Sequence, residues 1–274
     1  MDISICHYSF HRTWKEENWD TDRLCDEVAK LGVKGVDFHA GLLGDPENAD
    51  ERICNSIEDS GLTLTGLSLS TNFLLDDAKE LKDMVAKTRR WIEISSEVEA
   101  PVSRIFGGSL KDRTDPDARA AAMYRIIDPL AELADYAEGL GVILALENHG
   151  GLPCTGEEQK AVINKIDSPA LRATVDVGNY MACGQEGIEG TRIASPLCAY
   201  VHLKDMKKNP DESTPWGWKP SAATLGQGDV DLPACIEEIG RAGYDGWLAI
   251  EYEAPDDERK GLKESVDYIR SVLK

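Results

Sequence analysis

The chain alternates between short runs of aliphatic and β-branched residues and longer segments in which apolar residues recur every three or four positions. The short runs predict strands, and the longer segments predict amphipathic helices. Eight strands are expected, at Ile3–Tyr8, Gly35–His39, Thr63–Ser70, Val102–Phe106, Val142–Glu147, Arg172–Val177, Ala199–Lys204 and Trp247–Tyr252. Eight helical segments are expected between and after them, at Thr21–Leu31, Ala49–Ser60, Asp76–Val98, Pro116–Gly139, Gly156–Ile166, Ile188–Ile193, Asp231–Ala242 and Asp257–Leu273.

Strict alternation of strand and helix predicts an α/β fold, and eight such units predict a closed (β/α)8 TIM barrel. A barrel of this type uses about 250 residues, so we expect the 274 residues to form a single domain spanning 1–274. A doubly wound sheet would place a glycine-rich phosphate-binding turn after its first strand. Here SFHRTWKEEN follows that strand instead. The longest expected loop, Asp205–Asp229, follows the seventh strand on the face where barrels carry active sites.

Four consecutive strands in the second half of the chain each bring an acidic or imidazole side chain to the mouth of the expected barrel. These side chains are Glu147, Asp176, His202 and Glu251. Three crowded carboxylates repel one another unless they are protonated or bind a cation. Three oxygen donors and one nitrogen donor suit Mn²⁺, Mg²⁺ or Co²⁺, and they also accept Zn²⁺ or Fe²⁺. We therefore predict one bound divalent metal ion, with Mn²⁺ as the first choice.

Side-chain alternation along a strand adds two imidazoles to the candidate site. If Glu147 points into the barrel mouth, His149 does as well, and we expect His149 to contact substrate. We expect the same of His7, which lies on the first strand. The alternative for both residues is a structural role, such as a hydrogen bond to the backbone of a loop.

Lys204 shares a strand face with the metal-ligand candidate His202. An ammonium group beside a divalent cation is unfavourable unless an anion lies between them. We therefore expect Lys204 to contact a substrate oxygen or a carboxylate such as Asp205 or Glu253, and not the metal. The alternative is a lysine that bends outward into solvent or pairs with a structural acid.

Five segments carry distinctive motifs: LALENHGG at 144–151, TVDVGN at 174–179, VHLKD at 201–205, LGQGDVDLPACIEEI at 225–239 and GYDGWLAIEYE at 243–253. Through them the chain resembles, over essentially its whole length, the xylose isomerase-like TIM-barrel family, also called sugar phosphate isomerase/epimerase. The resemblance implies the same four metal ligands. In the ketose 3-epimerases of this family the two ligand glutamates also exchange the substrate proton, one on each face of an enediolate. The resemblance therefore implies that Glu147 and Glu251 are a catalytic acid/base pair.

The chain departs from the ketose 3-epimerase pattern at three positions. Asn179 stands where those enzymes have a substrate-binding His, and we expect Asn179 to bind substrate. Pro153 replaces a Glu, and Lys208 replaces an Arg. The family also contains keto-inositol dehydratases, in which the same enediolate expels a β-hydroxyl group. Lys204 is the candidate oxyanion-binding or acid residue for that chemistry.

The predicted function is a divalent-metal-dependent isomerase or epimerase that acts on a small-molecule sugar or keto-sugar through a metal-stabilised enediolate. The alternative is a lyase or dehydratase that uses the same metal site on a keto-sugar, keto-glycoside or keto-inositol. A non-catalytic sugar-binding protein is a third interpretation, although binding alone does not require a charged metal site. A DNA-repair endonuclease of this fold needs more metal-binding histidines than the five in the chain can supply.

The amino-acid composition limits the kinds of partner that we expect the protein to bind. Fifty acidic and 30 basic residues give a formal net charge of −20, which disfavours nucleic acids and anionic membranes as partners. A homo-oligomer is compatible with the sequence. The chain has no 18-residue apolar run and no basic N-terminal region, so we expect neither a transmembrane helix nor a signal peptide. Seven cysteines without a C-x-x-C motif are expected to be reduced thiols of a cytoplasmic protein.

Overall fold

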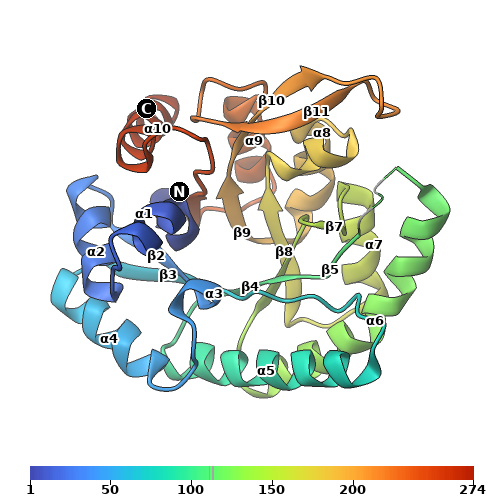
Figure 1. The fold of residues 1–274 in the computed structure, drawn as a ribbon, viewed down its shortest axis with the longest axis horizontal. Coiled ribbons are helices and arrows are strands. Elements are labelled where there is room, and N and C mark those ends of the chain that lie inside the picture. Colours follow the sequence, from blue (N-terminus) through green and yellow to red (C-terminus); the bar gives the residue numbers. More distant parts are fainter. Residues whose placement is uncertain (111, 113) are drawn as a thin grey trace.

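The computed structural model describes residues 1–110, 112 and 114–274. In this part of the chain, eight parallel strands close into a barrel in the order β1-β12-β9-β8-β6-β4-β3-β2, and β2 pairs with β1 to complete the circle (Figure 1). These strands are β1 (Asp2–Cys6), β2 (Gly35–His39), β3 (Thr63–Ser68), β4 (Ser103–Phe106), β6 (Leu144–Glu147), β8 (Leu171–Asp176), β9 (Cys198–Leu203) and β12 (Trp247–Ile250). The predicted (β/α)8 barrel is confirmed.

A helix follows each barrel strand and lies on the outside of the barrel (Figure 1). These helices are α2 (Thr21–Lys30), α4 (Ala49–Ser60), α5 (Ala78–Glu97), α6 (Pro116–Gly139), α7 (Gly156–Ile166), α8 (Gly187–Ala194), α9 (Leu232–Arg241) and α10 (Glu258–Val272). The start of α6 is capped: the Asp115 carboxylate accepts hydrogen bonds from the first backbone N–H groups of this helix, and Pro116 occupies the first helical position. No helix of the described ranges has both the length and the apolar content needed to cross a bilayer.

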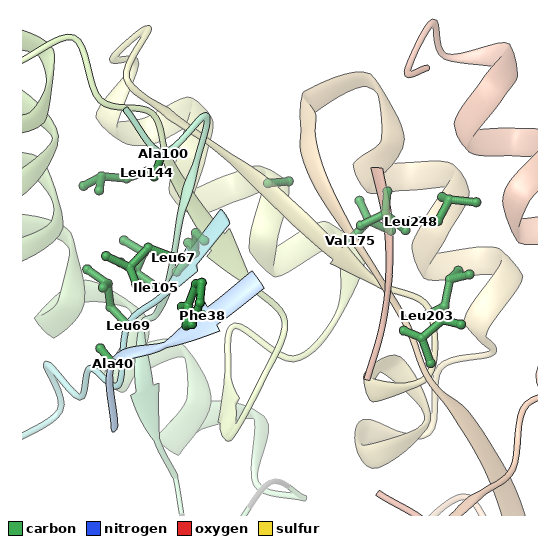
Figure 2. Packing of buried hydrophobic residues seen from close by; sticks show 14 of the residues in the cluster. Phe38, Ala40, Leu67, Leu69, Ala100, Ile105, Leu144, Val175, Leu203 and Leu248 are labelled. Atoms are coloured by element: carbon green, nitrogen blue, oxygen red, sulfur yellow. The ribbon is translucent and has the colours of Figure 1, made fainter. Parts of the chain in front are cut away.

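Side chains alternate along each barrel strand between the helices and the barrel interior. On the helix side, Leu146 and Leu203 are fully buried in a continuous apolar core. Phe38, Leu67 and Ile105 belong to the same core and gather beside β2, β3 and β4 (Figure 2). Because the apolar positions face the helices, the positions between them face the interior of the barrel. These interior positions include all of the acidic and imidazole ligand candidates.

The prediction that Asp205–Asp229 is a loop is wrong in part, because the segment contains an antiparallel hairpin of β10 (Asp205–Pro210) and β11 (Trp218–Ala223). The two strands read DMKKNP and WKPSAA, so proline and lysine hide the period-two apolar pattern that marks a strand. Other short elements also escape sequence analysis. They are η1 (His7–Phe10), α1 (His11–Glu16), α3 (Ala40–Leu43), β5 (Gly108–Ser109), β7 (Gly151–Leu152), η2 (Asn179–Cys183) and η3 (Ser195–Leu197).

The prediction that all seven cysteines are reduced is wrong for two of them. Cys154 and Cys183 form a disulfide, with their Cα atoms 6.1 Å apart. Cys154 lies in the connection after β6, and Cys183 ends η2 after β8. Because β6 and β8 are adjacent in the barrel, these connections meet, although 29 residues separate the two cysteines in sequence. The described free cysteines are Cys6, Cys25, Cys54, Cys198 and Cys235.

Glu258, at the start of α10, fastens the end of the barrel to its beginning. Its buried carboxylate accepts hydrogen bonds from the backbone N–H groups of Arg12 and Thr13 at 3.1 and 2.8 Å, and from the Thr13 hydroxyl at 2.6 Å. The guanidinium of Arg12 lies 3.2 Å from the same carboxylate. These contacts hold α1, which follows the first strand, against the helix that follows the last one.

Replacing Glu258 with Ala should destabilise the protein. The change leaves the donors of α1 without their buried acceptor, and we expect the free energy of unfolding to fall by about 2–3 kcal/mol. Urea unfolding measures this loss. The control is Glu237→Ala, which removes an exposed ion pair with Arg241 and should change stability by at most about 0.5 kcal/mol. Equal losses in the two variants would contradict the role given to Glu258.

Candidate active site

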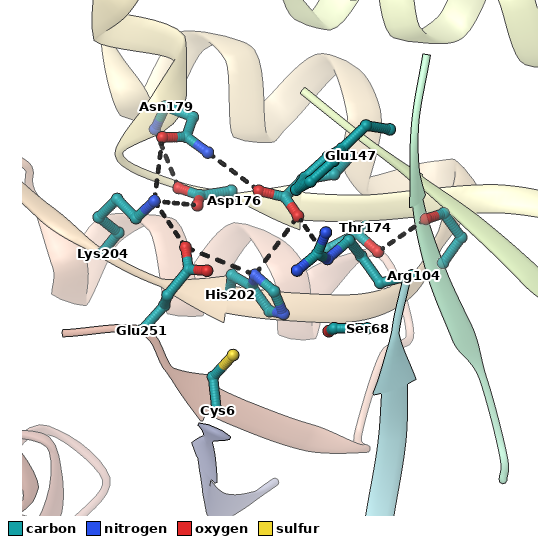
Figure 3. A network of polar contacts seen from close by, with 12 residues as sticks. Cys6, Ser68, Arg104, Glu147, Thr174, Asp176, Asn179, His202, Lys204 and Glu251 are labelled. Carbon is teal, nitrogen blue, oxygen red and sulfur yellow. Dashed lines mark hydrogen bonds and ion pairs between the residues drawn. The ribbon is translucent and has the colours of Figure 1, made fainter. Parts of the chain in front are cut away.

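Four side chains from four adjacent strands meet at the mouth of the barrel. Glu147 and Asp176 end β6 and β8, His202 lies near the end of β9, and Glu251 directly follows β12. One donor atom from each of them lies within 4.8 Å of the others, and all four residues are buried. Figure 3 shows the carboxylates of Glu147 and Glu251 approaching the His202 ring from opposite sides. The structure thus brings together the four residues predicted as ligands.

The donor atoms of this cluster fit a metal ion. His202 Nδ1 lies 3.6 Å from Glu147 Oε2 and 3.8 Å from Glu251 Oε2, which leaves space between the donors. Both His202 ring nitrogens make no hydrogen bond to any described residue, whereas Glu147 Oε2 and Asp176 Oδ2 make ion pairs, with Arg104 at 3.0 Å and with Lys204 at 3.5 Å. Burial lowers the pKa of His202 to about 3, so the ring is neutral and can donate a lone pair. Buried polar atoms without partners are unfavourable, and a divalent cation would satisfy them.

Backbone groups orient one oxygen of Asp176 and leave the other for a ligand. Asp176 Oδ1 accepts hydrogen bonds from the N–H groups of Gly178 and Asn179, both at 2.9 Å. Asn148 pairs with the backbone of Asp176, donating from Nδ2 at 2.9 Å and accepting at Oδ1 at 3.1 Å. Burial raises the pKa of Asp176 to about 7, against the effect of Lys204. A cation in the cluster therefore competes with a proton for this carboxylate.

Arg104 is a member of the site that the sequence analysis missed. Its fully buried side chain places Nε 3.0 Å from Glu147 Oε2, while Nη1 donates to the carbonyl of Leu69 at 3.1 Å. The guanidinium also lies 4.0 Å from the ring centre of Phe106. Burial raises the pKa of Glu147, and the charge of Arg104 opposes that rise. Val102, Arg104 and Phe106 lie two positions apart and share one face of the fourth predicted strand. The side-chain alternation that placed Glu147 in the barrel mouth would therefore also have placed Arg104 there.

Lys204 is buried in the cluster and contacts carboxylates, as predicted. Its Nζ lies 2.5 Å from Glu251, 2.9 Å from Glu253 and 3.5 Å from Asp176. Nζ also donates to Asn179 Oδ1 at 3.3 Å. Burial acts to raise the pKa of Glu251, but the charge of Lys204 outweighs it and holds that pKa below the ordinary value. Lys204 therefore keeps Glu251 ionised.

Asp205, the other expected partner of Lys204, has a different role. Its carboxylate accepts hydrogen bonds from backbone N–H groups, at 2.9 Å from Gly226, 2.8 Å from Gly228 and 3.2 Å from Val230. A Cβ atom at position 228 would collide with this carboxylate, so only glycine fits there. Asp205 thus folds the LGQGDV segment against the end of β9.

A cavity of about 190 Å³ opens beside the cluster. Its lining residues are Tyr8, His39, Ser70, Arg104, Phe106, His149, Glu251 and Glu253. The His149 ring stacks on Phe106 with centroids 4.1 Å apart, and His39 faces Tyr8 at 5.2 Å. His149 thus lies where the sequence predicts, in the wall of the barrel mouth. A cavity of this size suits a small molecule with polar edges.

His7 and Asn179, two predicted substrate-binding residues, lie outside the lining of this cavity. His7 is fully buried, and its Nδ1 accepts a hydrogen bond from the backbone N–H of His39 at 3.3 Å. Asn179 donates from Nδ2 to Glu147 Oε1 at 3.0 Å, while its Oδ1 faces Lys204. The hydrogen bonds of His7 and Asn179 hold other residues of the site in place. That these two residues also contact substrate stays a prediction.

Comparisons with known proteins agree with this fold. The sequence profile described as xylose isomerase-like TIM barrel matches residues 25–272. Inosose dehydratase from Geobacillus kaustophilus is 20% identical, over 86% of this chain and 81% of that protein. Ketose 3-epimerase from Arthrobacter globiformis is 23% identical, over 85% of this chain and 79% of that protein. The uncharacterised protein MJ1311 from Methanocaldococcus jannaschii is 27% identical, and the match spans about half of each chain, 52% of this one and 48% of that one.

A solved structure with the same fold is that of the IOLI protein with a bound zinc atom. Its TM-score to this chain is 0.78 at 17% sequence identity, and the alignment covers 100% of this chain and 98% of that one. The matched curated proteins thus include both an epimerase and a dehydratase, on a barrel shape that this chain shares.

Adding Mn²⁺ should stabilise the protein, and more so at higher pH. Because the folded-state pKa of Asp176 is raised to about 7, the metal-free protein holds a proton that the unfolded chain releases. The contribution of this group to stability therefore falls as the pH rises from about 4 to 7. Mn²⁺ needs the ionised carboxylate, so its stabilising effect grows over the same range. At about 100 times the dissociation constant we expect about 2.7 kcal/mol.

Thermal unfolding with and without Mn²⁺ at about pH 5.5 and pH 8 measures this effect, and the Tm shift should be larger at the higher pH. His202→Ala should abolish the shift. His11→Ala removes an imidazole outside the cluster and should retain it. A shift that survives in His202→Ala would place the cation elsewhere.

Proposed function

Because the chain belongs to the xylose isomerase-like TIM barrel family, we propose that it is a divalent-metal-dependent isomerase or epimerase of a sugar or keto-sugar. The observation that carries the proposal is the convergence of three buried carboxylates and a neutral imidazole beside a small polar cavity. Metal-assisted enolisation uses a cation that two substrate oxygens can chelate and a carboxylate next to the carbon-bound proton. This cluster offers both in one place.

Glu147, Asp176, His202 and Glu251 would hold the metal, with Mn²⁺ as the first choice for this set of oxygen and nitrogen donors. When bound, a divalent cation supplies Lewis acidity, which polarises a carbonyl and lowers the pKa of the neighbouring C–H group. The cavity beside these residues, at about 190 Å³, is smaller than the usual pocket for a drug-sized ligand. Its aromatic and imidazole walls suit the C–H faces and hydroxyl groups of a sugar.

Glu147 and Glu251 would exchange the substrate proton. Each carboxylate has a buried cation beside it, Arg104 for Glu147 and Lys204 for Glu251. Lys204 keeps Glu251 in the ionised form that accepts a proton, whereas burial outweighs Arg104 at Glu147 and raises its pKa. One glutamate takes the proton from the carbon next to the carbonyl and leaves an enediolate. Return of a proton to the opposite face of that carbon gives the epimer, and return to the neighbouring carbon gives the isomer.

Lys204 favours a second candidate function, a lyase that dehydrates a keto-sugar or keto-inositol. Its ammonium group is buried against Glu251 and Glu253, two of the residues that line the cavity. In this reaction a glutamate removes the proton next to the carbonyl, and Lys204 donates a proton to the β-hydroxyl group. That group departs as water while a carbon–carbon double bond forms. The inosose dehydratase among the relatives catalyses a reaction of this class.

The conservative variants Glu147→Gln and Glu251→Gln should each lower turnover by more than about 10²–10⁴-fold, because each residue both ligates the metal and transfers a proton. The assay incubates enzyme, Mn²⁺ and a panel of keto-sugars in D₂O and reads products by mass spectrometry and NMR. Deuterium should appear next to the carbonyl. In a variant that has lost one of the two bases, exchange at one face can survive while inversion is lost. Activity like that of the unmodified protein in either variant would refute the acid/base assignment.

The mass of the product separates the two candidate functions, and Lys204→Met tests Lys204 as the acid of the lyase. If the enzyme is a lyase, this variant should lose about 10²-fold or more in the formation of the product that lacks one water. If it is an epimerase or isomerase, the product keeps the substrate mass. The matched control is Lys208→Met, because Lys208 pairs with Glu186 and lies over Trp218 outside the cavity. Normal dehydration by Lys204→Met would remove Lys204 as the acid.

A further inference from the structure

A polar layer lies in the barrel directly beneath the proposed metal ligands. The interior of a TIM barrel is ordinarily packed with branched apolar side chains. Here Cys6, Asp37 and Ser68 come from β1, β2 and β3, and each of them is fully buried. Figure 3 shows Cys6 and Ser68 on the side of His202 away from Asp176. A buried carboxylate in this position is costly and calls for a partner.

The Asp37 carboxylate is held in place by neutral donors. Ser68 Oγ donates to Asp37 Oδ2 at 2.8 Å, and Cys6 Sγ lies 4.0 Å from Oδ1. Gly66 makes room for it: a Cβ at this position would lie 3.1 Å from Asp37 Oδ2 and 3.2 Å from the Tyr200 ring. His202 Nε2 lies 4.0 Å from Oδ2, and the Tyr200 hydroxyl and the charge of Arg104 also act on this carboxylate.

The two nitrogens of His202 face different surroundings. Nδ1 points at Glu147 and Glu251, into the proposed metal cluster, whereas Nε2 points at Asp37. An imidazole that binds a cation through one nitrogen is neutral and carries its proton on the other. The proton must therefore sit on Nε2, opposite the buried carboxylate. Shortening a 4.0 Å separation to a hydrogen bond takes a small rotation of either side chain.

We propose that Asp37 is a positioning residue, which accepts a hydrogen bond from His202 Nε2 and so fixes the tautomer and the ring orientation with which Nδ1 binds the metal. The inference rests on the metal site of the proposed function and adds a residue to it. A carboxylate behind a metal-binding imidazole raises the basicity of the ligand nitrogen.

Cys6, Asp37 and His202 also lie close enough together to suggest a second metal group. Three features disfavour that alternative. Oδ2 of Asp37 is already engaged by Ser68. Burial and the nearby Asp37 raise the pKa of the Cys6 thiol well above its ordinary value, so the thiolate that a metal prefers is disfavoured. The group also offers three donors, one fewer than the cluster above it.

Metal titration of the full-length protein tests the proposal. Apo-protein is titrated with Mn²⁺ by electron paramagnetic resonance and with Co²⁺ by its visible absorption. We expect one ion per chain in the unmodified protein. In Asp37→Val the affinity should fall about 10–100-fold, with a changed Co²⁺ spectrum. Asp37→Asn keeps an oxygen acceptor without the charge and should lose less. Ser4→Ala is the matched control, because Ser4 is a buried polar residue of β1 whose hydroxyl makes no hydrogen bond to a described residue, and it should bind Mn²⁺ normally.

Histidine NMR of the Zn²⁺-loaded unmodified protein gives a test that does not depend on the folding of a variant. His202 should carry its proton on Nε2 and bind Zn²⁺ through Nδ1. The reverse tautomer, or unchanged affinity in a folded Asp37→Val variant, would overturn the role of Asp37 while the proposed function stands. Two ions per chain, reduced to one in Asp37→Val, would establish the second metal group instead. An unmodified protein that binds neither Mn²⁺ nor Co²⁺ would overturn both this inference and the proposed function.

Discussion

The burial of several carboxylates at one end of an apolar barrel is the constraint on which the rest of the site depends. Like charges a few ångströms apart in a medium of low polarity cannot all stay ionised unless cations lie among them. The described residues supply two such cations, Arg104 beside Glu147 and Lys204 beside Glu251. Burial nevertheless raises the pKa of Glu147, and it raises the pKa of Asp176 to about 7, so these two cations do not neutralise the cluster. A divalent cation would complete the neutralisation, which is why a metal site explains the cluster better than a purely structural network does.

Strand alternation explains how much of this arrangement could be predicted from sequence. Aliphatic residues flank Glu147, Asp176, His202 and Glu251. The period-two pattern therefore places all four on the strand face opposite the aliphatic side chains, which in a barrel is the interior face. Alternation does not say which neighbours approach one another. The contact between Lys204 and Glu253 was expected, but the closer contact with Glu251 depends on the register of β9 against β12.

The residues that sequence analysis missed fall into two kinds. Arg104 and Asp37 obey the same alternation as the ligands, but a buried arginine and a buried aspartate become meaningful only when their partners on other strands are known. The Cys154–Cys183 disulfide and the β10–β11 hairpin left no local pattern at all. They depend on which connections meet at the barrel mouth, which is a property of closure and not of any single segment.

Two of the three residues at which the chain departs from the ketose 3-epimerase pattern are engaged in contacts with other side chains. Lys208, on β10, pairs with Glu186, and its ammonium group lies over the ring of Trp218 on β11. Asn179 bridges Glu147 and Lys204: its amide nitrogen donates to Glu147, and its amide oxygen accepts from Lys204. Side chains held in this way cannot also reach far into the cavity. Under the proposed function, recognition of the substrate therefore falls to the opposite wall of the barrel mouth, formed by His39, Arg104, Phe106 and His149. That wall comes from β2, β4 and the connection after β6, so under the proposed function most of it belongs to the first half of the barrel, whereas the proposed metal ligands lie in the second half.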